Sequence, residues 1–177
     1  MVLVLTGVAV LMGGILAYVN HLTEGPINEQ KAQALADGIK TVMRGEVTLT
    51  STDTIPAEDG KNVYVIYTNE KGAAVQSTTM GFGGDLKVLV GFDKEGNILG
   101  YTLLEHAETP GLGAKADKWF QEGGNGNIIG KHPEKNKLGV TKGGEGEVDA
   151  ITASTITSRA FLLAVNNAYQ AYLKNKK

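Results

Sequence analysis

The pattern of apolar and polar positions divides the chain into three parts. Residues 1–19 contain no charged side chain and are dominated by Val, Leu, Ile, Ala and Gly. From residue 47 to residue 106 apolar side chains recur at every second position, which predicts β-strands. From Arg159 toward Lys174 they recur at helical spacing. The pattern therefore predicts an apolar N-terminal helix, a sheet and a closing helix.

The apolar N-terminal run is just long enough to cross a membrane as a helix. At about 1.5 Å per residue it spans a hydrocarbon core of about 30 Å. We favour a single transmembrane span at residues 1–20. A cleaved signal peptide would carry a positive n-region, yet no Lys or Arg precedes the run, and core helices seldom lack polar residues all round. Those two interpretations remain as alternatives, and the absence of a basic flank leaves the orientation open.

The segment after this run is expected to connect the membrane to a folded domain. Thr23 to Pro26 predicts a break followed by a new helix, whose incomplete apolar stripe reaches about Met43 before Gly45 ends it. The expected organisation is an anchor at 1–20, a linker helix at 21–45 and a domain at 46–177. A domain of that size supports a hydrophobic core of its own.

The region of period two predicts several closely spaced strands. Short turns at 69–72 and 93–96 separate them, which favours an antiparallel meander with helices covering one side or end of it. Leu86, Val88, Val90 and Phe92 share one face of a predicted strand. The expected fold class is α+β, an antiparallel sheet packed with helices, preceded by one N-terminal transmembrane helix. The glycine-rich turn at 81–84 lacks the spacing of a dinucleotide fingerprint, so a Rossmann domain is not expected.

Composition and charge narrow the possible chemistry. With 17 basic and 19 acidic residues the net charge is −2, so nucleic acid is not an expected partner. The absence of cysteine excludes disulfides, Cys-ligated iron–sulfur clusters and a thiol nucleophile within this chain. The three histidines, at 21, 106 and 132, are too scattered for a metal-binding pair, and no metal site is predicted. Redox chemistry here would need an organic cofactor.

Five hydroxyl side chains are concentrated just before the closing helix. They lie in the segment 149–158, D-A-I-T-A-S-T-I-T-S, as Thr152, Ser154, Thr155, Thr157 and Ser158. Helix capping is one explanation, although a cap needs one or two hydroxyls. The alternative is a phosphate site, since free N–H groups and the positive end of the dipole attract anions to a helix N-terminus. Thr155 would lie at that N-terminus, with Arg159 about one turn later on the same face.

The segment 106–113, H-A-E-T-P-G-L-G, is the second stretch with functional character. Pro110 and Gly111 predict a turn, Gly113 permits close backbone approach, and residues 114–121 predict a short helix. An acid–base pair of His106 and Glu108 is the less favoured interpretation, and no catalytic residue is assigned. The following connection, 123–146, carries eight glycines, and loops of this length are uncommon without a function.

These two segments together resemble the RnfG and NqrC family. Residues 149–157 are similar to its flavinylation motif, Asp-x-x-Ser/Thr-Gly-Ala-Thr-x-Ser/Thr, and residues 108–113 match its Glu-Thr-Pro-Gly-Leu-Gly segment. The order of anchor, linker, meander, the two segments and closing helix also agrees. Two positions depart from the motif: Ala153 stands where Gly is typical, and Ser154 where Ala is typical. Ser154 is therefore a second candidate acceptor beside Thr155.

The resemblance implies an electron-carrying subunit of a membrane ion-translocating ferredoxin:NAD oxidoreductase (Rnf) complex. FMN would be held covalently by a phosphoester to Thr155, and the chain would perform no complete reaction alone. The residues implied in flavin binding are Thr152, Ser154, Thr155, Thr157, Arg159, Glu108, Thr109, Pro110, Gly111, Leu112 and Gly113. The alternatives are an NqrC-type subunit of a sodium-pumping NADH:quinone reductase, a membrane-anchored FMN-binding or sensory domain, and a structural domain whose hydroxyls only cap a helix.

The resemblance also implies partners and a location. The partners are integral membrane flavin and iron–sulfur subunits, a flavin transferase for maturation, and the lipid bilayer. The location is the cell (inner) membrane, with a single pass and the domain on the extracytoplasmic side.

Overall fold

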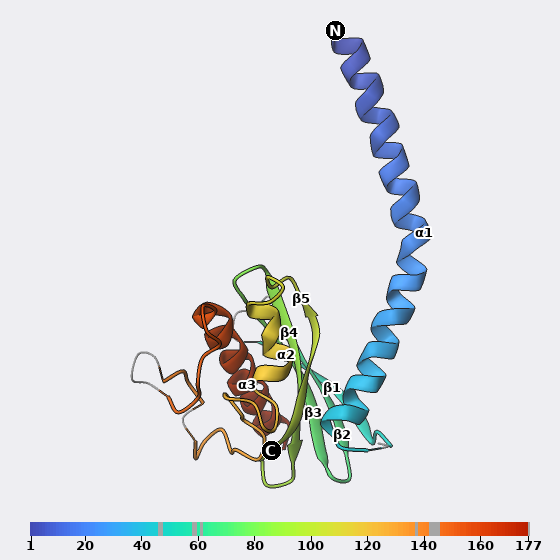
Figure 1. Cartoon of the computed structure of the whole chain (residues 1–177). Coiled ribbons are helices and arrows are strands. Elements are labelled where there is room, and N and C mark those ends of the chain that lie inside the picture. Colours follow the sequence, from blue (N-terminus) through green and yellow to red (C-terminus); the bar gives the residue numbers. More distant parts are fainter. Residues whose placement is uncertain (46–47, 58–59, 61, 137, 142–145, 177) are drawn as a thin grey trace. The chain divides into compact units, whose positions relative to one another are not determined.

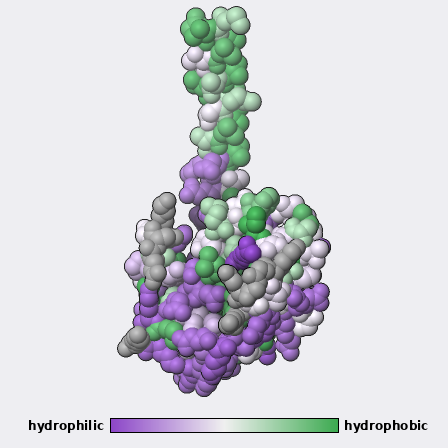
Figure 2. Space-filling view, turned by 90° about the vertical axis from the view of Figure 1, so that its left-hand side faces the viewer, coloured by the Kyte–Doolittle hydropathy of each residue, from purple (hydrophilic) through white to green (hydrophobic). Residues whose placement is uncertain are grey.

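The computed structural model of the chain describes residues 1–45, 48–57, 60, 62–136, 138–141 and 146–176. The chain forms two compact units, Met1–Ala36 and Asp37–Lys177. The first unit is helical from Val2 and makes up most of α1 (Val2–Val42). An 18-residue window of α1 has a mean hydropathy of 2.4 and is entirely exposed. Figure 2 shows this apolar surface in green. By length and composition, α1 is compatible with a single-pass membrane anchor.

The predicted break between Thr23 and Pro26 is wrong, because α1 continues through Pro26. Proline lacks the N–H that would bond to the preceding turn, so the helix loses a hydrogen bond there. The Thr23 hydroxyl donates to the carbonyl oxygens of Val19 at 3.0 Å and Asn20 at 3.2 Å in the same region. Residues 29–36, E-Q-K-A-Q-A-L-A, are all strong helix formers and favour continuation beyond the proline.

The second unit is built on one five-stranded antiparallel sheet in the order β1-β2-β3-β4-β5. This arrangement confirms the predicted meander and the α+β fold class. It adds an edge strand, β1, that the sequence pattern does not delimit. The strands are β1 (Ser51–Pro56), β2 (Val63–Asn69), β3 (Gly72–Met80), β4 (Asp85–Asp93) and β5 (Ile98–His106).

The closing helix α3 (Thr155–Lys176) packs on one face of this sheet, against β3 and β4 (Figure 1). The predicted face of β4 is confirmed: Leu86, Val88, Val90 and Phe92 are all fully buried in the core shared with α3. The Thr79 hydroxyl of β3 also donates to the Ala160 carbonyl of α3 at 2.9 Å. These contacts fix the first turn of α3 relative to the end of β3.

The opposite face of the sheet is covered as well, by the last turn of α1. Ile39 and Val42 are buried there. Gly91 of β4 and Gly100 of β5 lie directly beneath Val42, where a Cβ on Gly91 would collide with the Val42 carbonyl oxygen. The expectation that helices cover only one side or end of the sheet is therefore incomplete. Glycines in two neighbouring strands make room for the helix backbone.

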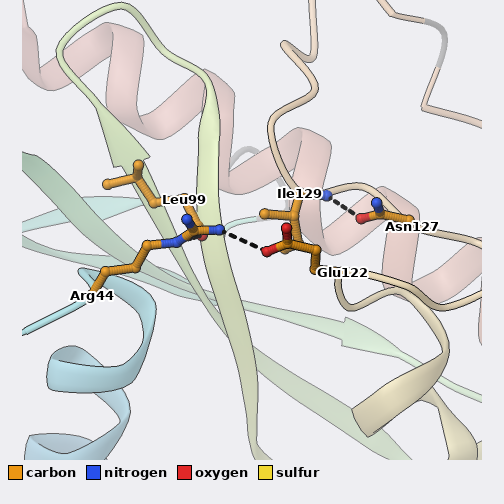
Figure 3. Close-up of polar contacts among 5 residues, drawn as sticks. All are labelled: Arg44, Leu99, Glu122, Asn127 and Ile129. Atoms are coloured by element: carbon orange, nitrogen blue, oxygen red, sulfur yellow. Dashed lines mark hydrogen bonds and ion pairs between the residues drawn. The ribbon is translucent and has the colours of Figure 1, made fainter.

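Arg44 links the chain that follows α1 to the rest of the second unit (Figure 3). Its Nε donates to the Leu99 carbonyl at 3.0 Å, and its Nη2 pairs with Glu122 Oε2 at 3.3 Å. Both side chains of the ion pair are largely exposed, so the pair contributes at most about 1 kcal/mol. Its role is to hold the end of α1 beside β5.

The predicted helix at 114–121 is confirmed in shorter form, as a 3₁₀ turn η1 (Gly113–Lys115) and a single α-helical turn α2 (Ala116–Trp119). The buried Tyr101 hydroxyl fixes this segment by donating to the Ala116 carbonyl at 2.6 Å and accepting from the Phe120 N–H at 3.2 Å. Val140 forms an isolated parallel bridge with Val148.

Candidate functional site

The two segments singled out in the sequence lie against each other and enclose a cavity of about 390 Å³. This volume falls within the range of small-molecule sites, roughly 300–1,000 Å³. The hairpin turn between β3 and β4 contributes a third wall. The lining residues are Phe82 from that turn, then Glu108, Thr109, Leu112 and Gly113, and Ala153, Ser154, Thr155, Ile156 and Thr157.

The helix start that the hydroxyl-rich segment predicts is confirmed. Thr155 is the first residue of α3, and Ser154 immediately precedes it. The Ser154 carbonyl accepts the first helical bond, from the Ser158 N–H at 3.0 Å. The Ser154 N–H in turn bonds to the Ile151 carbonyl at 2.9 Å, which shapes the turn that leads into α3. The N–H groups of the first helical turn therefore lie beside the cavity, where they favour an anion.

Ala153 adopts a backbone conformation that L residues rarely occupy, with φ of 61°. It is the residue that stands where the family motif usually has glycine. Glycine adopts this left-handed region without a steric penalty, whereas a Cβ makes it costly. The departure at Ala153 is therefore accommodated by strain, and the turn that the motif requires is retained.

Four of the five hydroxyls differ clearly in their surroundings. Ser154 Oγ donates to Thr157 Oγ1 at 3.0 Å, and both residues are buried. The Ser158 hydroxyl is buried too, donating to the Ser154 carbonyl and accepting from the Ile151 N–H, each at 2.9 Å. Thr155 is half-buried, and among the described residues its hydroxyl has no hydrogen-bond partner. Hydrogen bonds within the protein thus account for the hydroxyls of Ser154, Thr157 and Ser158, whereas none among the described residues accounts for that of Thr155.

Glu108 joins the three walls of the cavity. Its side chain is 6% exposed, and Oε2 accepts from the Thr157 hydroxyl at 2.6 Å. Oε1 accepts from the backbone N–H groups of Phe82 at 2.7 Å and Gly83 at 3.3 Å. The carboxylate therefore holds the hairpin turn and the first turn of α3 to its own segment. The His106 ring accepts from the Glu108 N–H at 3.3 Å and makes no contact with its carboxylate among the described residues, which leaves an acid–base pair without support.

Glycines allow the backbone to approach this carboxylate closely. A Cβ on Gly81 would collide with Glu108 Oε1, and a Cβ on Gly113 would collide with Oε2 and lie 2.8 Å from Thr157 Oγ1. The prediction that Gly113 permits close backbone approach is therefore confirmed. The group that the Gly113 backbone approaches is the Glu108 side chain.

Three apolar side chains form the outer walls of the cavity. Phe82 is 68%, Ile156 is 57% and Leu112 is 41% exposed. Large apolar side chains that stay exposed around a cavity with a few polar groups are typical of a ligand-binding site. Walls of this kind suit an apolar ligand surface, and the N-terminus of α3 suits an anionic group.

Thr155 also borders a second, more polar cavity of about 450 Å³ on its other side. Thr152 and Asp149 line this cavity, so Thr152 is beside Thr155 without facing the apolar walls. Asp149 is fixed there, its carboxylate accepting from the Thr141 hydroxyl at 3.3 Å and its carbonyl from Trp119 Nε1 at 2.8 Å. A group attached to Thr155 therefore has space on both sides of the threonine.

The remaining predicted site residues lie outside the first cavity. Pro110 is exposed and lines none of the three cavities that the described residues outline here. Gly111 borders the third of them, an open cavity shared with Lys115 and Lys118. Arg159 is exposed one turn into α3, and it lines none of these cavities either.

Three lining residues are absent from the predicted flavin-binding residues, namely Phe82, Ala153 and Ile156. The glycine-rich turn at 81–84 was the available signal for Phe82, since a large apolar residue between glycines has no core position to fill. Ile156 lies inside the motif itself, at a position the family pattern leaves unspecified. Its neighbours Thr155 and Thr157 were both identified.

Comparison with known proteins agrees with this geometry. The FMN-binding domain family matches residues 81–170, which contain all three walls of the cavity, so the second unit contains an FMN-binding domain. The chain is 34% identical to the G subunit of the Na(+)-translocating ferredoxin:NAD(+) oxidoreductase complex of Acetobacterium woodii, covering 89% of this chain and 83% of that protein. It is 30% identical to the G subunit of the ion-translocating oxidoreductase complex of Shewanella piezotolerans, covering 96% and 86%. The chain belongs to this G-subunit family, which the sequence resemblance predicted.

A solved structure shares the fold. It is the crystal structure of the C subunit of the Na(+)-translocating NADH-quinone reductase from Parabacteroides distasonis, with a TM-score of 0.56 and 20% identity. The match covers 83% of this chain and 92% of that one. At this identity the likeness establishes the fold alone, whereas the sequence relatives establish the family.

Proposed function

We propose that this chain is the FMN-bearing, electron-carrying subunit of a membrane ion-translocating oxidoreductase complex of the ferredoxin:NAD type. Its relatives are named as the G subunit of such complexes, and its own FMN-binding domain supplies a cavity of suitable size and polarity. The chain passes electrons through its flavin and completes no reaction alone. The other subunits of the complex deliver and remove those electrons.

We further propose that FMN is attached through a phosphoester to Thr155. The observation that carries this assignment is the difference between neighbouring hydroxyls. Thr155 is half-buried and borders both cavities, and its hydroxyl makes no hydrogen bond with described residues. Ser154 is buried and its hydroxyl proton is engaged by Thr157. This favours Thr155 over Ser154 as the acceptor.

The chemistry of attachment uses the N-terminus of α3. The Thr155 oxygen forms a bond to the FMN phosphorus, the hydroxyl proton is released, and the activated flavin donor loses its leaving group. A flavin transferase catalyses this step. The resulting phosphodiester keeps one negative charge, which the free N–H groups of the first helical turn stabilise. Arg159, exposed one turn later, adds a favourable charge at longer range.

The experiment compares Thr155→Val with Ser154→Ala after co-expression with a flavin transferase. Flavin fluorescence on a denaturing gel reports covalent attachment, and a native far-ultraviolet circular dichroism spectrum reports folding. We expect Thr155→Val to fold and lose the fluorescent band, and Ser154→Ala to keep it. A labelled Thr155→Val variant contradicts the assignment.

We propose a single-pass inner-membrane location, with α1 as the anchor and the domain on the extracytoplasmic side. The apolar, exposed α1 supports the anchor. The side can be tested cleanly because the chain has no cysteine. A single Lys71→Cys substitution, in the exposed turn between β2 and β3, should react with a membrane-impermeant maleimide in cells whose outer barrier is opened. Labelling only after inner-membrane lysis contradicts the proposed side.

A further inference from the structure

Glu108 is the one buried carboxylate among the described residues, and it lines the proposed flavin cavity. Its carboxylate oxygens accept hydrogen bonds from two backbone N–H groups and one hydroxyl. A carboxylate that accepts at both oxygens and donates to none of the described residues is arranged as the ionised form. The cavity wall therefore carries a fixed negative charge.

No described cation neutralises this charge. Glu108 makes no ion pair with the described residues, whereas Glu105, three residues earlier, pairs with Lys87 at 3.1 Å. The N-terminus of α3 carries about half a positive charge and compensates part of the negative charge of Glu108, which bonds to Thr157 in the first turn of that helix. The remaining field acts on whatever occupies the cavity, and water screens it little at Glu108 itself, which is buried.

We infer that Glu108 sets the reduction potential of the bound flavin as well as holding the cavity walls together. This inference rests on the proposed function, that FMN occupies the cavity. Two-electron reduction of an isoalloxazine ring with uptake of one proton leaves the ring one unit more negative. The electrons come from a reduced partner subunit, or from dithionite in the test below, and the proton comes from solvent. A fixed carboxylate in the wall disfavours this added charge, so it lowers the potential and makes the reduced flavin a stronger electron donor.

The structure offers a substitution that removes the charge and retains the contacts. In Glu108→Gln the side-chain amide oxygen can still accept from the N–H groups of Phe82 and Gly83. The amide nitrogen can donate to Thr157 Oγ1, since a hydroxyl both donates and accepts. Glu105→Gln is the matched control, because Glu105 lies outside the cavity and already has a cationic partner.

The test is a potentiometric titration of the full-length, flavin-loaded protein with dithionite, followed by flavin absorbance. We expect Glu108→Gln to shift the potential to more positive values, on the order of tenfold in the equilibrium constant for reduction. Glu105→Gln should match the unsubstituted protein. A loaded Glu108→Gln variant with an unchanged potential overturns the inference and leaves Glu108 a purely structural contact. An unsubstituted protein that takes up no flavin contradicts the proposed function instead.

A second variant covers the case in which Glu108→Gln fails to fold or to load. Glu108→Met combined with Thr157→Val replaces both partners of the 2.6 Å hydrogen bond with apolar groups of similar shape, which costs less than removing one. The double variant leaves the N–H groups of Phe82 and Gly83, which belong to an exposed turn and can bond to water, and it removes the acceptor of the Ser154 hydroxyl. This double variant should also shift the potential to more positive values. A potential equal to that of the unsubstituted protein contradicts the inference.

Discussion

The Thr157 hydroxyl donates to the Glu108 carboxylate across 2.6 Å, although the two residues are 49 positions apart in the chain. This bond joins the two segments whose sequence patterns indicate a function. Because Ser154 donates to Thr157 in turn, the same chain of hydrogen bonds occupies two of the hydroxyls near the helix N-terminus. Thr155, between them in sequence, is left facing the cavities.

Thr157→Val should lower the free energy of unfolding by about 1–3 kcal/mol, because it leaves a buried carboxylate without its shortest hydrogen bond. Urea denaturation followed by circular dichroism measures the loss. Thr155→Val is the control, since its hydroxyl makes no hydrogen bond with described residues and its removal should change stability by less than about 0.5 kcal/mol. Equal losses in the two variants would mean that the Glu108–Thr157 bond contributes nothing.

Gly113→Ala should be more destabilising than Gly111→Ala. Gly111 has a φ of 76°, but a Cβ added there would meet nothing within 4 Å, so alanine incurs only backbone strain, about 1 kcal/mol. At Gly113 the added Cβ meets the buried Glu108 carboxylate and Thr157, and either the hydrogen bond or the backbone must move. Chemical denaturation of both variants gives the comparison. The reverse order would refute the close approach at Gly113.

Ala153→Gly should stabilise the protein by up to about 1 kcal/mol, by relieving the left-handed conformation of Ala153. The gain is limited because glycine also adds entropy to the unfolded chain. Ala107→Gly is the control, an exposed alanine outside the left-handed region, and it should give no gain. Differential scanning calorimetry distinguishes the two. A loss of stability in Ala153→Gly would mean that the turn is not strained.

Tyr101 should make stability fall at alkaline pH. Burial raises the pKa of this phenol well above its ordinary value of 10.0, because the neutral hydroxyl is enclosed and bonded to the Ala116 carbonyl. A group whose pKa is raised by folding stabilises the folded state, and this contribution is fully present at pH values below the pKa of the group in the unfolded chain. That contribution is lost as pH rises from about 10 toward the folded pKa. Tyr101→Phe should therefore flatten the alkaline decline of the urea midpoint, and an unchanged decline would exclude this role.

Local sequence patterns predicted much of this fold, because each pattern coincides with one buried face. Leu86 to Phe92 alternate because one side of β4 faces α3, and the hydroxyls gather around Thr155, where α3 begins. Long-range packing was not visible in the same way. The cover that Val42 provides over Gly91 depends on a helix turn about fifty residues away, and periodicity carries no signal for it.

The sequence predicted the two segments that form two walls of the cavity, but it did not predict the third wall, the turn that carries Phe82. Glu108 and Thr157 were identified individually, but nothing in the sequence shows that one carboxylate binds both the hydroxyl and the turn at Phe82. The opposite error occurred at Pro26, where a strong local signal for a break was overridden by the helix formers that follow it. In both cases the structure that a short sequence segment adopts depends on the residues packed around it or following it.

Peptide mass spectrometry distinguishes attachment of FMN to Thr155 from attachment to a neighbouring hydroxyl. The full-length protein, co-expressed with a flavin transferase and extracted from membranes, is digested, and the peptide spanning residues 149–159 is fragmented. We expect this peptide to carry the mass of FMN less one water, with fragment ions that place the addition on Thr155. An unmodified peptide in a fully matured sample, or fragments that place the flavin on Ser154 or Thr157, would contradict it.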